Sequence, residues 1–349
     1  MRPRAKRALV AGAALAVTLA SLVLPWVPSF WPVALSQATA HAAAAIFAPA
    51  IAAITLGTVG HAAFSHRIGR NESFNHAGNA FAAAAGISAF IWGPVVVFFL
   101  LAAMSVASLF TVFAIPAGAI NYDRARGLHG DTQVQGAQCK VKEQPSGLSV
   151  LITCRPLLIF AACAVLFHFA NAAMLPLVGQ KLALQDRNSG TSLMSACIVA
   201  AQIVMVPMAL LVGAKADSWG RKPLFLGGLI ILPIRGVLYT LSDDPYWLVA
   251  VQLLDGVGAG IYGAIFPIIV ADLMRGTGRF NLAEGAVITA QGIGAALSTT
   301  VAGFVVVSAG YSAAFLTPAG VAAAGLLLFW LAIPETRDAD AASAGRPRE

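Results

Sequence analysis

The stretch GAKADSWGRKPLF, residues 213–225, separates two long apolar segments. Only 11% of the chain is charged, yet four charged side chains gather in this stretch: Lys215, Asp217, Arg221 and Lys222. Gly213 and Gly220 flank the aspartate. Because glycine allows tight turns and close approach of backbones, the pattern predicts an ordered loop between two helices.

The composition places the chain in a membrane. Hydrophobic residues make up 58% of the 349 residues, and the mean hydropathy is +0.80. A soluble chain carries about 25% charged residues, which this chain does not approach. The net charge of +7 fits Lys- and Arg-rich cytoplasmic loops. We therefore expect a lipid bilayer as the surroundings and no nucleic-acid partner.

Long apolar segments predict the helices. A membrane-spanning helix needs about 20 apolar residues. Ten candidate segments lie at 8–24, 32–59, 77–93, 95–120, 156–178, 192–213, 223–241, 246–271, 280–307 and 312–333. Their hydrophobicity is continuous rather than alternating, which excludes a β-barrel. The predicted fold is an all-α, polytopic bundle of about ten transmembrane helices.

The distribution of Lys and Arg predicts the orientation. With the N-terminus in the cytoplasm, all but three of the 22 Lys and Arg residues fall in cytoplasmic segments. Lys181 and Arg187 fall outside, and Arg235 lies within a span. Cytoplasmic loops are rich in these residues, so we expect both termini in the cytoplasm and a location in the plasma membrane, the inner membrane of a bacterium.

The chain repeats itself. With a shift of 215 residues, KRALVAGAALAV at 6–17 aligns with RKPLFLGGLIIL at 221–232. The first apolar segment therefore corresponds to a span in the second half, which favours a retained helix. The alternative is a secretory signal peptide, because basic residues followed by an apolar segment also begin such peptides.

The loop and the repeat together resemble the major facilitator superfamily. Its signature loop has roughly the form Gly-x-x-x-Asp-x-x-Gly-Arg-Lys/Arg, and every key position is filled here by Gly213, Asp217, Gly220, Arg221 and Lys222. The resemblance implies that Asp217 accepts hydrogen bonds at the N-terminus of a helix in the other half, near Asn75–Gly78, and that Arg221 pairs with Asp272. Ordinary loop charges remain the alternative.

The predicted domains depart from this family, which has two halves of six helices. We expect an incomplete first half at 1–120, a cytoplasmic linker at 121–155, a six-helix half at 156–334 and a tail at 335–349. Lys6 aligns with Arg221, so the chain begins just after the aspartate of a first-half loop. Either the start is mis-assigned or truncated, or the chain is a ten-helix variant.

Two charges lie inside predicted spans. Arg235 and Asp255 both align with alanines, Ala20 and Ala40, in the other half. At about 1.5 Å per residue their depths differ by about 4–5 Å, which an arginine side chain can reach. Charges in lipid are costly and are often functional, so the two residues are candidates for a cavity pair or for proton coupling. Alternatively, Arg235 reaches outward to the interface and Asp255 is hydrated.

Further polar residues extend the candidate substrate and proton-coupling site. His41 lies one position past the alanine that aligns with Asp255, and His168 and Asn171 lie in the span after the linker. A buried neutral histidine that bonds a carbonyl group is the structural alternative. The four cysteines lack metal-ligand spacing, so we expect no metal, and no motif indicates another cofactor.

The function predicted from these features is secondary active transport. The chain has no phosphate-binding loop and no recognised catalytic motif, so we expect neither ATP hydrolysis nor enzyme activity. We expect a monomer that moves a small organic solute or drug by alternating access, coupled to protons and directed to efflux. The alternative is a truncated or non-transporting relative of this superfamily.

Overall fold

The computed structural model describes residues 5–27, 29–85, 93, 95–128, 149–185 and 187–337. Within these residues the chain forms helices and no strand. The helices before the linker are α1 (Ala5–Val23), α2 (Phe30–Ala44), α3 (Phe47–Val59), α4 (Phe64–Ala85) and α6 (Val95–Ala114), followed by the short η1 (Ala117–Ala119) and η2 (Arg124–Arg126). Those after it are α7 (Ser149–Thr153), α8 (Arg155–Ala172), α9 (Met174–Gln185), α10 (Arg187–Trp219), α11 (Arg221–Leu238), α12 (Pro245–Leu273) and α13 (Phe280–Ala332).

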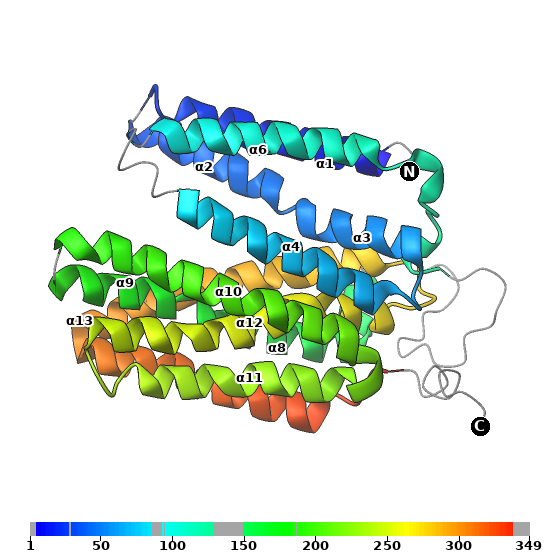
Figure 1. The fold of residues 1–349 in the computed structure, drawn as a ribbon. Coiled ribbons are helices and arrows are strands. Elements are labelled where there is room, and N and C mark those ends of the chain that lie inside the picture. Colours follow the sequence, from blue (N-terminus) through cyan, green and yellow to red (C-terminus); the bar gives the residue numbers. More distant parts are fainter. Residues whose placement is uncertain are drawn as a thin grey trace.

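The helices lie side by side in a layered bundle (Figure 1). We call α1 to α6 the first-half helices and α8 to α13 the second-half helices, after the predicted division into domains, which stays a prediction. In Figure 1, α1, α2 and α6 form the outer layer, and α4 lies between them and the second-half helices. The contacts between the halves therefore depend mainly on α4.

The all-helical membrane fold is confirmed. Among the described residues, five segments are long and apolar enough to cross a bilayer: Phe30–Val59, Arg155–Gln185, Leu193–Trp219, Pro245–Leu273 and Phe280–Ala332. Two shorter apolar helices, Arg7–Val23 and Phe98–Ala114, accompany them. Several spans are interrupted, since the predicted span 32–59 forms α2 and α3 and the span 156–178 forms parts of α8 and α9.

Gly310 divides the last helix into the two spans predicted at 280–307 and 312–333. Its φ of 84° lies in the left-handed region that favours glycine, and it interrupts the helical backbone of α13. Phe280 at the start of α13 packs against Phe64, and Phe329 near its end packs against Phe225. The chain therefore returns to the end of the bundle where it began, as Figure 1 shows in orange and red.

The helix that contains the start of the third predicted span, 77–93, begins well before residue 77. The structure begins this helix at Phe64, and residues 86–92 of the predicted span lie outside the described residues. The polar stretch at 65–75 is helical because it packs against protein rather than lipid. For example, Asn71 donates a hydrogen bond to Thr55 of α3 at 2.9 Å. Hydropathy detects contact with lipid, so it missed this part of α4.

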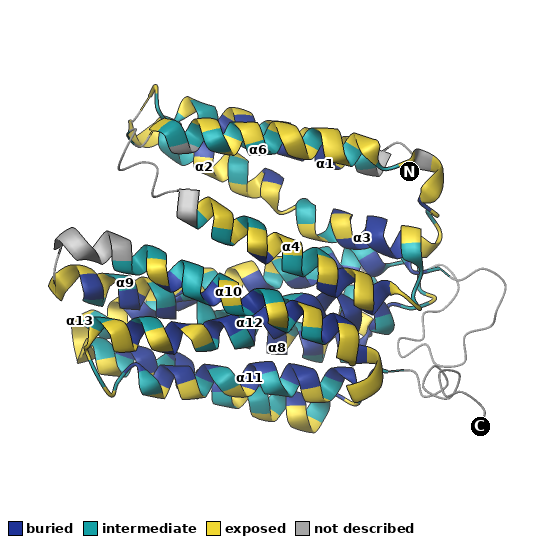
Figure 2. Cartoon of the chain, viewed as in Figure 1, coloured by how far each residue is buried: buried dark blue, intermediate teal, exposed yellow. Residues whose placement is uncertain are grey.

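The core lies among the second-half helices. Figure 2 shows most of the buried residues there, whereas α1, α2 and α6 are largely exposed or half-buried. Aromatic rings from several helices fill the centre: Phe160, Phe167, Phe225, Tyr262, Phe266 and Phe329. Close packing of this kind makes the second half a rigid body against which the first half is placed.

Candidate functional site

The stretch between α10 and α11 makes a sharp turn. We call residues 213–222 the signature loop. Its helix α10 ends at Trp219, and α11 begins at Arg221. Gly220 between them has a φ of 97°, and a β-carbon at this position would meet the carboxylate of Glu335. Both facts require glycine at this position.

Arg221 joins three helix ends. Its Nε donates to Asp272 Oδ2 at the end of α12 at 2.8 Å, and its Nη1 lies 2.9 Å from Asp217 Oδ1. The same Nη1 donates to the carbonyl oxygen of Ala216 at 2.8 Å. Arg221 is buried, so these charge-assisted hydrogen bonds hold α10, α11 and α12 together. The structure thus brings Arg221 and Asp272 together.

Asp217 reaches across to the first half. Its Oδ1 accepts a hydrogen bond from Ser65 Oγ at 3.0 Å, and Ser65 lies in the first turn of α4. The expected docking segment, Asn75–Gly78, is therefore wrong by about three helical turns. The reason is the earlier start of α4, because the helix N-terminus that favours a carboxylate lies at Phe64.

Two glycines let the halves approach closely beside this contact. A β-carbon on Gly69 of α4 would lie 2.5 Å from Gly213 Cα, and one on Gly213 would lie 2.9 Å from Gly69 Cα. No side chain fits between the two backbones. The bundle is therefore closed at the end where the signature loop lies, and Gly213 serves a helix crossing rather than a turn.

Glu335 completes the signature loop and was missed by the sequence analysis. Its Oε1 accepts from the backbone N–H of Arg221 at 2.8 Å, and its Oε2 accepts from that of Lys222 at 3.1 Å. A carboxylate at these free N–H groups stabilises the start of α11. The Lys222 Nζ donates to the carbonyl oxygen of Trp330 at 2.8 Å. The residue had been assigned to the tail, and no local pattern indicates its partner.

The two charges inside the spans form a buried ion pair. Arg235 on α11 is 1% exposed, and its Nη1 bonds Asp255 Oδ1 on α12. The Nη2 of Arg235 donates to Asn171 Oδ1 on α8 at 2.7 Å. The other carboxylate oxygen, Asp255 Oδ2, accepts from Gln252 Nε2 at 3.0 Å. Gln252 in turn accepts from the Tyr239 hydroxyl.

This buried network belongs to the second half. Its members come from α8, α11 and α12, and the Met174 sulfur of α9 lies 3.1 Å from Arg235 Nε. Both oxygens of Asp255 have partners, so the pair is well compensated for its loss of water. The sequence analysis had proposed Asn171 and Arg235 separately; the structure adds Gln252 and Tyr239 and connects them all.

The two predicted histidines do not join this network through any contact in the described residues. His41 near the end of α2 is exposed. The His168 ring on α8 lies edge-on to Tyr262, with ring centroids 5.1 Å apart, and its Nε2 is buried without a hydrogen-bond partner. Of the five predicted residues, Arg235, Asp255 and Asn171 therefore lie together, whereas His41 and His168 lie apart from them.

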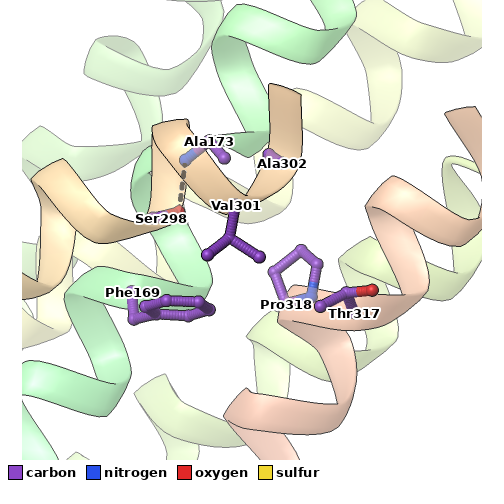
Figure 3. A pocket seen from close by; sticks show the side chains of 7 residues that line it. All are labelled: Phe169, Ala173, Ser298, Val301, Ala302, Thr317 and Pro318. Carbon is purple, nitrogen blue, oxygen red and sulfur yellow. Dashed lines mark hydrogen bonds between the residues drawn. The ribbon is translucent and has the colours of Figure 1, made fainter. Parts of the chain in front are cut away.

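A small recess lies between α8 and the two arms of α13 (Figure 3). Its lining is mostly apolar and includes Phe169, Val301 and Pro318. Its two hydroxyls already have protein partners, because Ser298 Oγ accepts from the Ala173 N–H at 3.1 Å and Thr317 donates within its own helix. The recess therefore offers few free polar groups to orient a solute.

Comparison with known sequences gives matches along the chain. The sequence model described as the Major Facilitator Superfamily matches residues 3–234 and 160–349. Two relatives from Mycobacterium tuberculosis, strains CDC 1551 and H37Rv, are each described as an uncharacterized MFS-type transporter. Each is 55% identical over 347 residues, which is 99% of this chain and 82% of the relative.

Comparison with solved structures finds the same fold. FucP of E. coli, a superfamily transporter in its outward conformation, matches with a TM-score of 0.67 and 13% identity. The match covers 93% of this chain and 82% of that one. The human organic anion transporter MFSD10 matches with a TM-score of 0.63 and 15% identity, over 93% of this chain and 77% of that one.

Proposed function

Because this chain belongs to the major facilitator superfamily, an integral multi-pass membrane family, we propose that it is a secondary active transporter working by alternating access. The solute is a small organic molecule or drug, moved in the direction of efflux and driven by protons. The few charges in the spans support an apolar or amphipathic solute over a phosphorylated one.

One observation carries the proposal: the two halves meet closely at the end where the signature loop lies. Asp217 bonds Ser65 there, and Gly69 crosses Gly213 without room for a side chain. A solute can pass this end only if α4 separates from α10. The contact includes the Ser65–Asp217 hydrogen bond and a backbone crossing without interlocked side chains, both of which can separate without unfolding either half. We therefore assign the signature loop the role of the closed gate.

The distribution of charge supports a cytoplasmic position for this gate. Cations accumulate at the helix ends around the signature loop, at Lys215, Lys222, Arg124 and Arg337. Figure 1 shows that α1 begins and α13 ends at the same end of the bundle. If the excess of Lys and Arg marks the cytoplasmic side, both termini lie in the cytoplasm, and the transporter is closed on its cytoplasmic side.

The Arg235–Asp255 pair is the candidate for solute binding or proton coupling that the sequence indicates. Its burial and its polar partners Asn171 and Gln252 support this assignment, because charges within spans are retained mainly where they act. A proton on Asp255 would have to displace Arg235. The pair therefore fits a group that responds to an arriving solute or proton, whereas exposed His41 has a weaker claim.

The test follows the gate directly, since no solute need be known. Spin labels on cysteines that replace Arg67 of α4 and Lys215 of α10, both exposed, report the separation of the halves at this end. All four native cysteines, Cys139, Cys154, Cys163 and Cys197, are replaced by serine so that only the two introduced cysteines carry labels. Alternating access predicts two distance populations in lipid nanodiscs. A single, unchanging distance would reject it.

Transport itself is tested in proteoliposomes that contain a trapped pH dye. A gradient of each solute in a panel of organic acids, bases and dyes is applied, and a transported solute should move protons across the membrane. Two distance populations without any solute-driven flux would favour a non-transporting relative. Proton-independent solute flux would reject the proton coupling but keep the transporter.

A further inference from the structure

One face of α4 carries two ionisable residues that belong neither to the signature loop nor to the Arg235–Asp255 network. Glu72 and His76 are four residues apart, so they lie one turn apart on the same face. His76 is 8% exposed, and Glu72 is half-buried. His76 contacts Gln202 of α10, and both residues lie near Gly263 of α12, so they are at the contact between the halves.

His76 has one ring nitrogen bonded and one free. Its Nδ1 lies 2.9 Å from Gln202 Oε1 of α10. Because this oxygen can only accept, Nδ1 carries the hydrogen, and Nε2 of the neutral ring carries the lone pair. Nε2 is buried and has no hydrogen-bond partner. A buried lone pair without a donor is costly, but burial also lowers the pKa of His76, so a proton held here needs a neighbouring carboxylate.

Glu72 lies beside that free nitrogen. Its Oε2 accepts from Asn75 Nδ2 at 3.1 Å. Glu72 Oε2 and His76 Nε2 also lie 3.8 Å and 3.9 Å from the point where Gly263 of α12 would carry a β-carbon. The carboxylate and the lone pair therefore border the same small space, which the missing side chain of Gly263 leaves open. A proton on the His76 ring would be stabilised by the negative charge of Glu72 across this space.

Other titratable groups near this space already have partners. On α12, the Tyr262 hydroxyl accepts a hydrogen bond from Gln291 Nε2, and Asp255 lies about two turns away in its pair with Arg235. On α10, no titratable residue lies within a turn of Gln202. On α3, Thr55 accepts a hydrogen bond from Asn71 in this part of α4. Arg67 and Arg70 of α4 are exposed.

We propose that Glu72 and His76 form a proton-binding site between the two halves, and that the proton bound there holds α4 against α10 and α12. The inference rests on the proposed alternating access. With the halves together, the pair without a proton leaves a half-buried carboxylate that water solvates only in part. With the halves apart, water solvates that carboxylate, so the site binds its proton more weakly.

The direction of the pH effect follows from linkage. The closed arrangement binds the proton more tightly, so low pH favours closure and high pH favours opening. For one linked proton, the ratio of closed to open molecules should fall by about tenfold per pH unit over the interval between the two affinities. The breaking of the bond from His76 to Gln202 accompanies the opening.

The test uses the same spin-label pair on the full chain, measured from about pH 5 to about pH 9, which spans the range of histidine titration. In the protein with Glu72 and His76 intact, the closed population should decrease as the pH rises. Glu72→Gln, which imitates the protonated acid, should stay closed throughout. His76→Gln should lose the pH dependence. His168→Gln is the control, because it removes another histidine, half-buried, whose Nε2 is buried without a hydrogen-bond partner, and it should leave the titration unchanged.

A variant that keeps both groups guards against misfolding. A β-carbon on Gly263 would make only ordinary contacts, so Gly263→Ala should fold normally and shift the midpoint of the titration. An unchanged midpoint would place the titrating group elsewhere. The proposal is overturned if the pH dependence persists in both Glu72→Gln and His76→Gln, or if Asp255→Asn alone removes it. One fixed distance at every pH would instead reject the proposed alternating access itself.

Discussion

Removing one member of the Arg235–Asp255 pair should destabilise the second half strongly. In Arg235→Met, Asp255 keeps only its bond from Gln252 and stays largely away from water. In Asp255→Leu, the guanidinium keeps Asn171 and the Met174 sulfur but has no counter-charge. An uncompensated buried charge costs about 3–5 kcal/mol, so each single change should lower the free energy of unfolding by about that amount.

The double change should cost less stability than the two single changes added together. It removes both charges and roughly keeps the volume, which leaves Asn171 Oδ1 without its donor and Gln252 Nε2 without its acceptor. Two unsatisfied polar groups cost about 1–3 kcal/mol each. The double variant should therefore lose about 2–6 kcal/mol, against about 6–10 kcal/mol for the two single losses added together, a coupling energy of about 4 kcal/mol at the middle of both ranges.

The assay is equilibrium unfolding in detergent for all four forms. The control is the Lys181–Asp243 pair near the opposite end of the bundle, where the Asp243 side chain is 72% exposed. Asp243→Asn should change stability by about 0–1 kcal/mol, because water solvates this carboxylate and leaves the ion pair weak. Strictly additive losses for Arg235 and Asp255 would refute the reasoning, since additivity means that the two charges do not compensate each other.

Three further predictions concern the gate. Asp217→Asn should weaken closure by about 1 kcal/mol, since the carboxylate is half-exposed, and should reduce solute flux at normal expression; unchanged flux would contradict the gating role. Gly69→Ala should cost about 1–3 kcal/mol in thermal unfolding, because the new methyl group meets backbone, whereas Gly227→Ala has open space and should be neutral or stabilising. A loss shared by both alanines would argue against the crossing. Glu335→Gln should expose the Lys222 amide to faster hydrogen exchange by about tenfold, a loss near 1.4 kcal/mol. Equal exchange rates would show that water caps α11 as well as the carboxylate does.

Local patterns in the sequence determined the membrane fold and part of the site. Continuous apolar segments predict spanning helices whatever their neighbours, because the bilayer requires each segment to satisfy its own backbone hydrogen bonds. The turn at Gly220 could be predicted because a short loop between helices needs glycine. The depths of Arg235 and Asp255 along their spans predicted that they could meet, since regular helices convert sequence position into height.

Only the tertiary structure decided which distant helices touch. Glu335 caps α11 from the far end of the chain, and Ser65 replaces Asn75–Gly78 as the partner of Asp217. Hydropathy measures contact with lipid, so the polar first turns of α4, buried against protein, did not register as helix. Likewise, His76 and Glu72 became a candidate site only through their neighbours in the other half, Gln202 and Gly263. Helix packing sets such neighbours, and spacing along one segment does not encode them.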